Sequence, residues 1–124
     1  MSLNKDQILA VSDATIKTVS VPEWGGEVCI RGLTGAQRDT FETRLVRQRS
    51  KSGAVDTTGL RSLLCSLAMC DEQGNPLFTE ADMPELEKKS AAALQRVFDA
   101  ASRMNGMAAD SVEEARADFT STEN

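Results

Sequence analysis

The stretch VSVPEWGGEVCIRGLTGAQR, residues 19–38, decides the fold. The β-branched residues of 15–21 predict a strand. Pro22 ends it, because proline cannot donate a hydrogen bond to a strand ladder. The glycines at 25–26 allow a tight turn, since glycine adopts positive φ without steric cost. Residues 27–31 provide the return strand, so the stretch predicts an antiparallel β-hairpin.

Helix signals lie on both sides of this hairpin. Thr34 and Gln37 have the spacing of a capping box and predict a helix directly after it. Asn4 and Gln7 have the same spacing and predict a short helix before it. Apolar residues at helical spacing predict two more helices, at about residues 58–70 and 90–104. Thr79 and Asp82 have the spacing of a further cap and predict a short helix that ends near Glu87.

Together these elements predict an α+β fold, mostly α, in which the N-terminal hairpin packs with about four helices. The length favours one domain, which we place at residues 1–106. Residues 107–124 are acidic and poor in large apolar side chains, and we expect a flexible tail there. Within it, residues 111–119 have an amphipathic pattern, and Phe119 is a candidate contact for a partner.

Composition argues against several functions. The net charge is −5, and residues 71–124 carry −7, which argues against nucleic-acid binding. No apolar run approaches the roughly 18 residues of a membrane span. Three cysteines indicate reduced thiols in a cytosol, and the lack of histidine removes the commonest general base and metal ligand. We therefore expect no enzyme activity, cofactor or metal.

The remaining apolar content relies on alanine, which buries little area. We therefore expect the chain to gain stability from an oligomer or another partner. Cys65 and Cys70, five residues apart on a predicted helix, are interpreted as structural thiols rather than nucleophiles.

Five side chains besides Phe119 are candidate partner contacts, each with a plainer alternative. Trp24 is either a lid over the hairpin or an exposed anchor, because tryptophan is enriched at binding hot spots. Arg44 and Arg47 form either a solvated helix face or a docking surface for an acidic segment. Phe41 lies on the same helix, and Met104 offers an adaptable contact on the last one.

The residues 21–26, Val28 and 31–39 resemble, as a set, the tail assembly chaperones of long-tailed bacteriophages and prophages. Asp71, the sequence GNPLFT at 74–79 and Asn105-Gly106 continue the resemblance, which spans about residues 5–106. It implies a non-catalytic protein of the host bacterial cytoplasm that is absent from the mature virion.

The resemblance also implies partners. Proteins of this family keep the tape measure protein soluble and help to recruit tail tube subunits, and a longer form commonly arises by ribosomal frameshifting. We expect copies to array along the client as a homo-oligomer, with modest affinity per copy. Two other classes stay open: a structural tail component, such as a tube, terminator or connector subunit, and a small thiol-based regulator.

Overall fold

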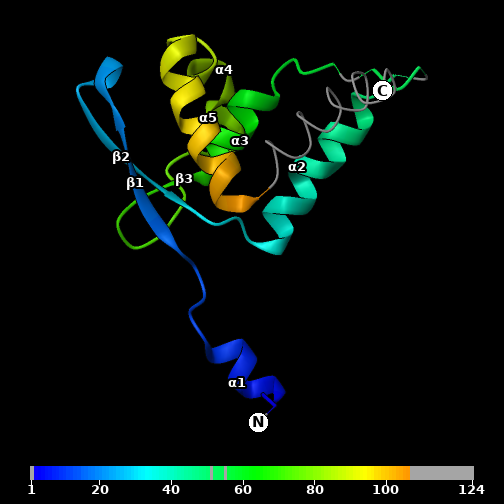
Figure 1. The fold of residues 1–124 in the computed structure, drawn as a ribbon, viewed down its shortest axis with the longest axis vertical. Coiled ribbons are helices and arrows are strands. Elements are labelled where there is room, and N and C mark those ends of the chain that lie inside the picture. Colours follow the sequence, from blue (N-terminus) through cyan, green and yellow to red (C-terminus); the bar gives the residue numbers. More distant parts are fainter. Residues whose placement is uncertain (1, 51, 55, 107–124) are drawn as a thin grey trace, which may run out of the picture.

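The computed structural model describes residues 2–50, 52–54 and 56–106. Figure 1 shows the order of the elements along the chain. The helices are α1 (Lys5–Ala10), α2 (Gly35–Arg47), α3 (Leu60–Ala68), α4 (Met83–Leu86) and α5 (Ala91–Asn105), with 3-10 turns η1 (Pro22–Trp24) and η2 (Glu80–Asp82). The strands are β1 (Ile16–Val21), β2 (Gly26–Arg31) and β3 (Met69–Cys70).

The predicted hairpin is confirmed. β1 pairs antiparallel with β2 in a register that sets Val19 opposite Val28 and Lys17 opposite Ile30. The turn between them is η1, and Gly25 ends it with φ +74°, a conformation that favours glycine. Side chains alternate along a strand, and Ile30 and Val28 therefore share the face that packs on the core.

One prediction in this region is wrong. Residues 69 and 70 were expected to end a helix, but they form β3, which pairs antiparallel with β2 and completes a sheet of order β1-β2-β3. The helix ends at Ala68, and Met69 adopts an extended backbone. Both strand residues are buried. A helix-period pattern could not reveal this end, because pairing with the distant β2 decides it.

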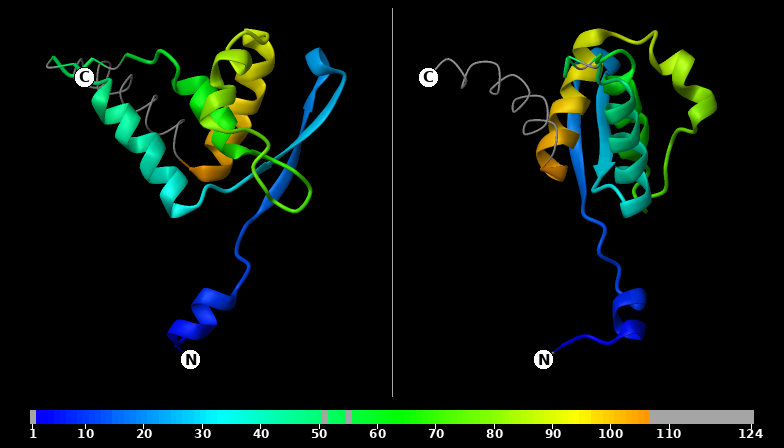
Figure 2. Two further views of the ribbon diagram at one scale, coloured as in Figure 1. Left: turned by 180° about the vertical axis from the view of Figure 1, so that it is seen from behind. Right: turned by 90° about the vertical axis from the view of Figure 1, so that its right-hand side faces the viewer.

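The core lies where the inner face of the hairpin meets α3 and α5. Leu64, Cys65 and Ala68 of α3 and Val97 and Ala101 of α5 are fully inaccessible to solvent. The two views of Figure 2 show α3 and α5 packed together next to the hairpin, with α2 on the outer side of α3. Helix α5 packs on β1 and β2, α3 packs on α5, and α2 and α4 pack on α3, which confirms the predicted α+β fold dominated by helices.

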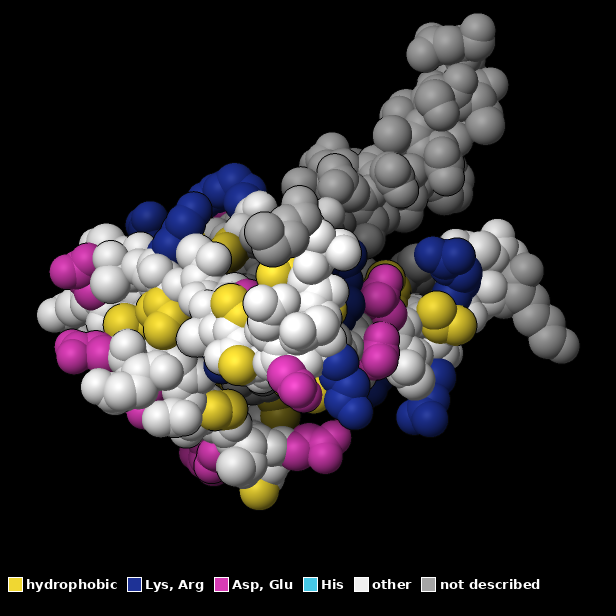
Figure 3. All heavy atoms as spheres, turned by 90° about the horizontal axis from the view of Figure 1, so that it is seen from below, with side chains coloured by type: hydrophobic (Ala, Val, Ile, Leu, Met, Phe, Trp, Pro, Cys, Tyr) yellow, Lys and Arg dark blue, Asp and Glu magenta, His cyan; other side chains and the backbone are white. Residues whose placement is uncertain are grey.

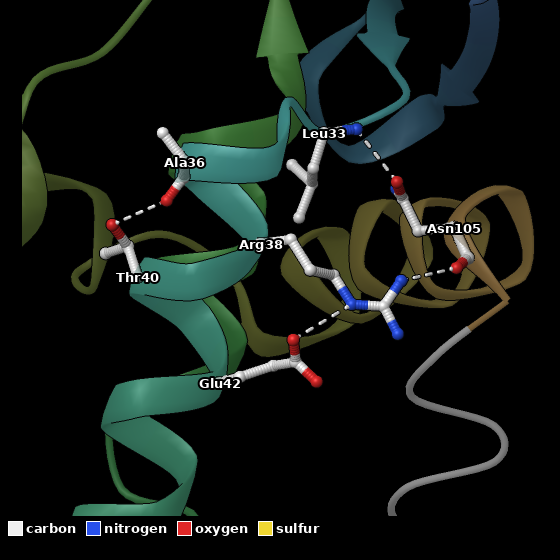
Figure 4. A network of polar contacts seen from close by, with 6 residues as sticks. All are labelled: Leu33, Ala36, Arg38, Thr40, Glu42 and Asn105. Atoms are coloured by element: carbon white, nitrogen blue, oxygen red, sulfur yellow. Dashed lines mark hydrogen bonds and ion pairs between the residues drawn. The ribbon is translucent and has the colours of Figure 1, made fainter.

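Polar contacts join the start of α2 to the end of α5. The backbone N–H of Leu33 donates to Oδ1 of Asn105 (2.8 Å), and Nη1 of Arg38 donates to the backbone oxygen of Asn105 (3.0 Å). Arg38 also lies 3.6 Å from Glu42, one turn further along α2. Figure 4 shows this network, which sets the direction in which α2 leaves the sheet.

Helix α1 stands apart from this body. Its capping box is present, with the Asn4 side chain accepting from the Gln7 amide and the Gln7 side chain accepting from the Asn4 amide. No residue of α1 is buried. Residues 11–15 connect it to β1 as an extended segment, and Figure 1 shows it well away from the other helices. The predicted tail at 107–124 lies outside the described residues.

Candidate partner-binding surface

An apolar groove lies between the tip of the hairpin and α4. Its volume is about 440 Å³. Trp24, Phe78 and Leu86 provide its apolar lining, and Asp82, Glu85 and Lys89 provide its charged rim. We call these six residues the Trp24 groove. An apolar floor with a few charged groups at its edge is typical of sites that bind another polypeptide or a small molecule.

The hairpin tip holds Trp24 in place. Trp24 is partly buried and packs against the core, as a lid over the hairpin would. The rest of its side chain is accessible to a partner, as an anchor would be. The neighbouring Glu23 accepts hydrogen bonds from Nε of Arg96 over 2.9 and 3.1 Å, which ties the tip to α5. A bond from its own backbone amide and this contact with Arg96 lower the pKa of Glu23.

The opposite wall of the groove comes from η2 and α4. Asp82 accepts from the Thr79 amide over 2.8 Å, within the capping box that the sequence predicts at this point. Leu86 is buried and Phe78 partly buried, whereas Glu85 is exposed and pairs with Lys88 over 3.3 Å. Of the six, the sequence indicated only Trp24 as a partner contact, because the hairpin tip and α4 are distant in sequence.

The second unusual surface is the N-terminal arm, by which we mean residues 3–11. Its apolar side chains Leu3, Ile8, Leu9 and Val11 are between 53% and 74% exposed. Figure 3 looks at the molecule from the end that carries α1, and it shows hydrophobic side chains at the surface among charged ones. Clustered exposed apolar residues mark sites of interaction.

Helix α2 presents a third surface. Phe41 is its one buried residue, at 3% exposure, and it belongs to the core. The sequence-based candidate Phe41 therefore lies inside the protein. Arg44 lies 4.0 Å from Glu80. Arg47 is exposed, as is Val46 between the two arginines.

The other candidate residues lie elsewhere. Met104 is partly buried and lines a polar hollow of about 390 Å³ at the base of the arm, together with residues 13–15, Lys17 and residues 31–35. Phe119 lies outside the described residues. The structure therefore does not bring the predicted contacts together: Trp24 lies at one end of the hairpin and Met104 at the other.

The two buried thiols, Cys65 and Cys70, are poorly suited to nucleophilic chemistry. Burial raises the pKa of Cys65 to about 12, and its Sγ donates to the Leu94 carbonyl (3.3 Å). Burial also raises the pKa of Cys70. Thiolates are the nucleophilic form, so both shifts disfavour reaction at neutral pH. Among the described residues, no three His, Cys, Asp or Glu side chains could hold a metal, and no helix could span a membrane.

A family model described as "Phage tail assembly chaperone" matches residues 5–118. The chain belongs to this family. Among solved structures, the "bacteriophage HK97 tail assembly chaperone" is similar to this chaperone, with a TM-score of 0.59 and 21% sequence identity. The match covers 83% of this chain and 94% of that chain, and it shows a shared fold. No curated protein matches the sequence.

The family match confirms the resemblance seen in the hairpin and the residues around it. It extends the matched region beyond residue 106, into the segment that the sequence suggested was a tail. The sequence did not predict the groove or the exposed arm of the chaperone. One local pattern did point to the arm, because Leu3 and Ile8 occupy the positions of a hydrophobic staple around the Asn4 cap.

Proposed function

We propose that this chaperone holds a tape measure protein soluble in the host bacterial cytoplasm before the tail tube polymerises, and that it helps to recruit tail tube subunits. It does so by binding, without catalysis, and it does not remain in the mature virion. The observation that carries the proposal is the family match over residues 5–118. The raised pKa of Cys65 favours this role over that of a thiol-based regulator.

We place the client on the outer face of α2. This helix has thirteen residues, and within the described part of the chain Phe41 is the one that is buried. Val46 is 66% exposed. Arg47 is exposed next to it, and its aliphatic stem can cover apolar surface while its guanidinium group stays in water. An exposed apolar side chain beside a positive charge suits an apolar helix that also carries acidic residues.

The test is co-expression of the chaperone with the tape measure protein of the same phage. We expect the tape measure protein to stay in the supernatant after centrifugation and to co-purify with the chaperone. Val46→Asp combined with Arg47→Glu should reduce the soluble fraction at least several-fold. The matched control is Leu77→Asp, which charges another exposed apolar residue away from α2.

Three results decide the proposal. A soluble client with the native chaperone and an aggregated one with the α2 variant support it. A client that aggregates equally with and without the native chaperone contradicts the function. Equal loss with Leu77→Asp contradicts the placement on α2. Pull-down of purified tail tube protein by the chaperone tests recruitment in the same way.

A further inference from the structure

Two of the three cysteines face each other across the sheet. Cys29 of β2 and Cys70 of β3 are direct partners in the antiparallel register. Side chains of residues directly opposite each other lie on the same face of a sheet. The next pair in the register, Ile30 and Met69, alternates to the other face, which packs on the core. The two thiols therefore lie side by side on the outer face of the sheet.

The backbone around Cys70 determines the spacing of this pair. The N–H of Met69 donates to the Cys65 carbonyl, and its C=O accepts from Leu77, so the polar groups of Met69 point away from β2. Backbone groups alternate along a strand, and those of Cys70 therefore point toward β2. The Cα atoms of such a hydrogen-bonded pair lie about 5.5 Å apart, within the range of roughly 4.4–6.8 Å that disulfides span.

A disulfide between the two also needs a small movement, which β3 can supply. The Cβ atoms of facing residues must approach by about 1–2 Å to accept the bond. β3 lies at the end of the strand order, pairs with β2 over two residues, and leads directly into the turn at 71–75. A disulfide closed in this way is strained, and strained disulfides are readily reduced. In a reducing cytosol the pair therefore stays as two thiols.

The two thiols differ in their access to solvent. Cys29 is partly exposed, whereas Cys70 is 1% exposed. Burial, and after it the neighbouring Cys29, raises the pKa of Cys70, as expected for two sulfur atoms that lie close together. Cys29 is thus the thiol that meets a reagent from solvent. Cys70 reacts next despite its raised pKa, because a group held beside its target acts at a high effective concentration.

The third thiol is kept apart from this pair. Cys65 belongs to the core cluster, on the face of the sheet opposite to Cys29. Its Sγ donates to the Leu94 carbonyl of α5 over 3.3 Å, and the residue is fully buried. The structure therefore provides one pair of facing thiols and a third cysteine that serves as an internal control.

We propose that Cys29 and Cys70 form a site of reversible oxidation, which a low-molecular-weight disulfide converts into a cross-strand disulfide. The Cys29 thiolate attacks one sulfur of the small disulfide, forms a mixed disulfide and releases a small thiolate, which takes up the proton that Cys29 lost. Cys70 then attacks the sulfur of Cys29 and releases the second small thiol, with its own proton. The protein loses two hydrogen atoms, and the small disulfide is reduced to two thiols.

The new bond would close the segment 30–69, which contains α2 and α3, into a loop. Closing a loop of this kind stabilises a protein mainly by restricting its unfolded chain. The bond would also fix β3, and with it the end of α3, to the hairpin. This inference does not depend on the proposed function, and it is tested without a client.

Oxidised glutathione tests the site in the native protein. Reduced protein is incubated with millimolar oxidised glutathione, unfolded in the presence of N-ethylmaleimide, and weighed by mass spectrometry. We expect a loss of two hydrogen atoms and one maleimide adduct, against three adducts on the reduced protein. Chymotrypsin cleaves after Leu67 and so separates Cys65 from Cys70, which identifies the linked pair. A lasting glutathione adduct on Cys29, three free thiols, or a disulfide that includes Cys65 would overturn the proposal.

Single variants provide matched controls. Cys65→Ala should form the disulfide to the same extent as the native protein. Cys70→Ala should stop at a glutathione adduct on Cys29, and Cys29→Ala should react at least about tenfold more slowly, because its remaining thiols are buried. Circular dichroism first confirms that Cys70→Ala is folded, and if it is not, Cys29→Ala at the partly exposed position carries the comparison.

Thermal unfolding measures the effect of the bond. Oxidation should raise the melting temperature of the native protein and of Cys65→Ala by at least about 5 °C, and dithiothreitol should reverse the rise. Cys29→Ala should show no such change. Oxidation in urea is the last control, because unfolding removes the register that sets the two thiols side by side. A disulfide between Cys29 and Cys70 that forms in urea but not in the native protein would overturn the proposal.

Discussion

The backbone amide of Leu33 donates a hydrogen bond across 2.8 Å to Oδ1 of Asn105, a residue 72 positions later in the chain. The same side chain donates through Nδ2 to the Ala101 carbonyl over 2.9 Å. Both partners are partly buried, so water cannot readily replace the bonds. Asn105 thereby holds the end of α5 against the segment that leads from the hairpin into α2.

Replacing Asn105 tests how much this link contributes. Asn105→Ala leaves the Leu33 amide without its acceptor, and we expect the free energy of unfolding to fall by about 1–3 kcal/mol. Asn105→Asp keeps an acceptor but removes the donor to Ala101, so its effect should be smaller. Asn75→Ala removes an exposed side-chain contact and serves as the control. Urea unfolding measures all three, and equal effects of Asn105→Ala and Asn75→Ala would contradict the assignment.

Gly74 provides a second test, in the turn before Pro76. Its φ is +89°, and a Cβ there would lie 3.3 Å from Cδ1 of Ile16. The Gly74 carbonyl also accepts from Nη1 of Arg31 over 2.7 Å, so the turn cannot move freely. Gly74→Ala should lower stability by about 1–2 kcal/mol from backbone strain alone, plus the cost of the contact.

Gly26 is the matched control for that substitution. A Cβ at Gly26 meets nothing within 4 Å, and its φ is not in the left-handed region. Gly26→Ala should therefore change the melting temperature little. Thermal unfolding of the two variants side by side would contradict this explanation if Gly26→Ala were the more destabilising.

The capping boxes and the hairpin turn show how far the sequence can predict the structure. Both capping boxes, at Asn4 and at Thr34, were visible because each depends on residues three positions apart. The turn at Gly25 was visible for the same reason. Such features are local, and local chemistry decides them.

The features that sequence reasoning missed depend on contacts between distant segments. β3 forms because Cys70 meets Cys29 across the sheet, which no periodicity in residues 58–70 could indicate. Phe78 and Leu86 line the groove because α4 packs near the hairpin tip. Phe41 was a candidate partner contact and lies in the core, because the sequence could not tell which side of α2 meets α3.

The link between Glu23 and Arg96 predicts a pH dependence. The pKa of Glu23 is lowered below its ordinary value of 4.5, first by its own backbone amide and then by Arg96. A depressed carboxyl pKa contributes stability that is fully present above the ordinary value and is lost as pH falls through the folded-state pKa. The stability difference between the native protein and Glu23→Gln should therefore be constant at pH 6–7 and should shrink below about pH 4.5.

Urea unfolding at several pH values from 7 to 3 measures this difference. Asp56 and Asp71 also have lowered pKa values and give both proteins a common acid sensitivity, which the comparison with Glu23→Gln removes. Arg96→Gln should show the same trend as Glu23→Gln. A stability difference that grows toward low pH would contradict the proposed interaction.

The cysteines predict an order of chemical modification. Cys65 is fully buried and its pKa is raised to about 12, so it should resist alkylation in the native protein. Cys29 is partly exposed and should react first. Mass spectrometry after treatment with a maleimide, with and without urea, gives the order. Rapid native labelling of Cys65 would revive the interpretation as a thiol-based regulator.

Phe41 and Val46 lie on one helix but face opposite environments, at 3% and 66% exposure. Phe41→Ala should lower the free energy of unfolding by about 3–5 kcal/mol, because it opens a cavity in the core. Val46→Ala should change it by less than about 0.5 kcal/mol, as is usual for surface substitutions. Client binding, measured well below the melting temperatures of both variants, should be weakened more by Val46→Ala than by Phe41→Ala. Loss of binding by a folded Phe41→Ala protein, with none by Val46→Asp, would place the client contact on the inner face of α2 and refute the assignment made here.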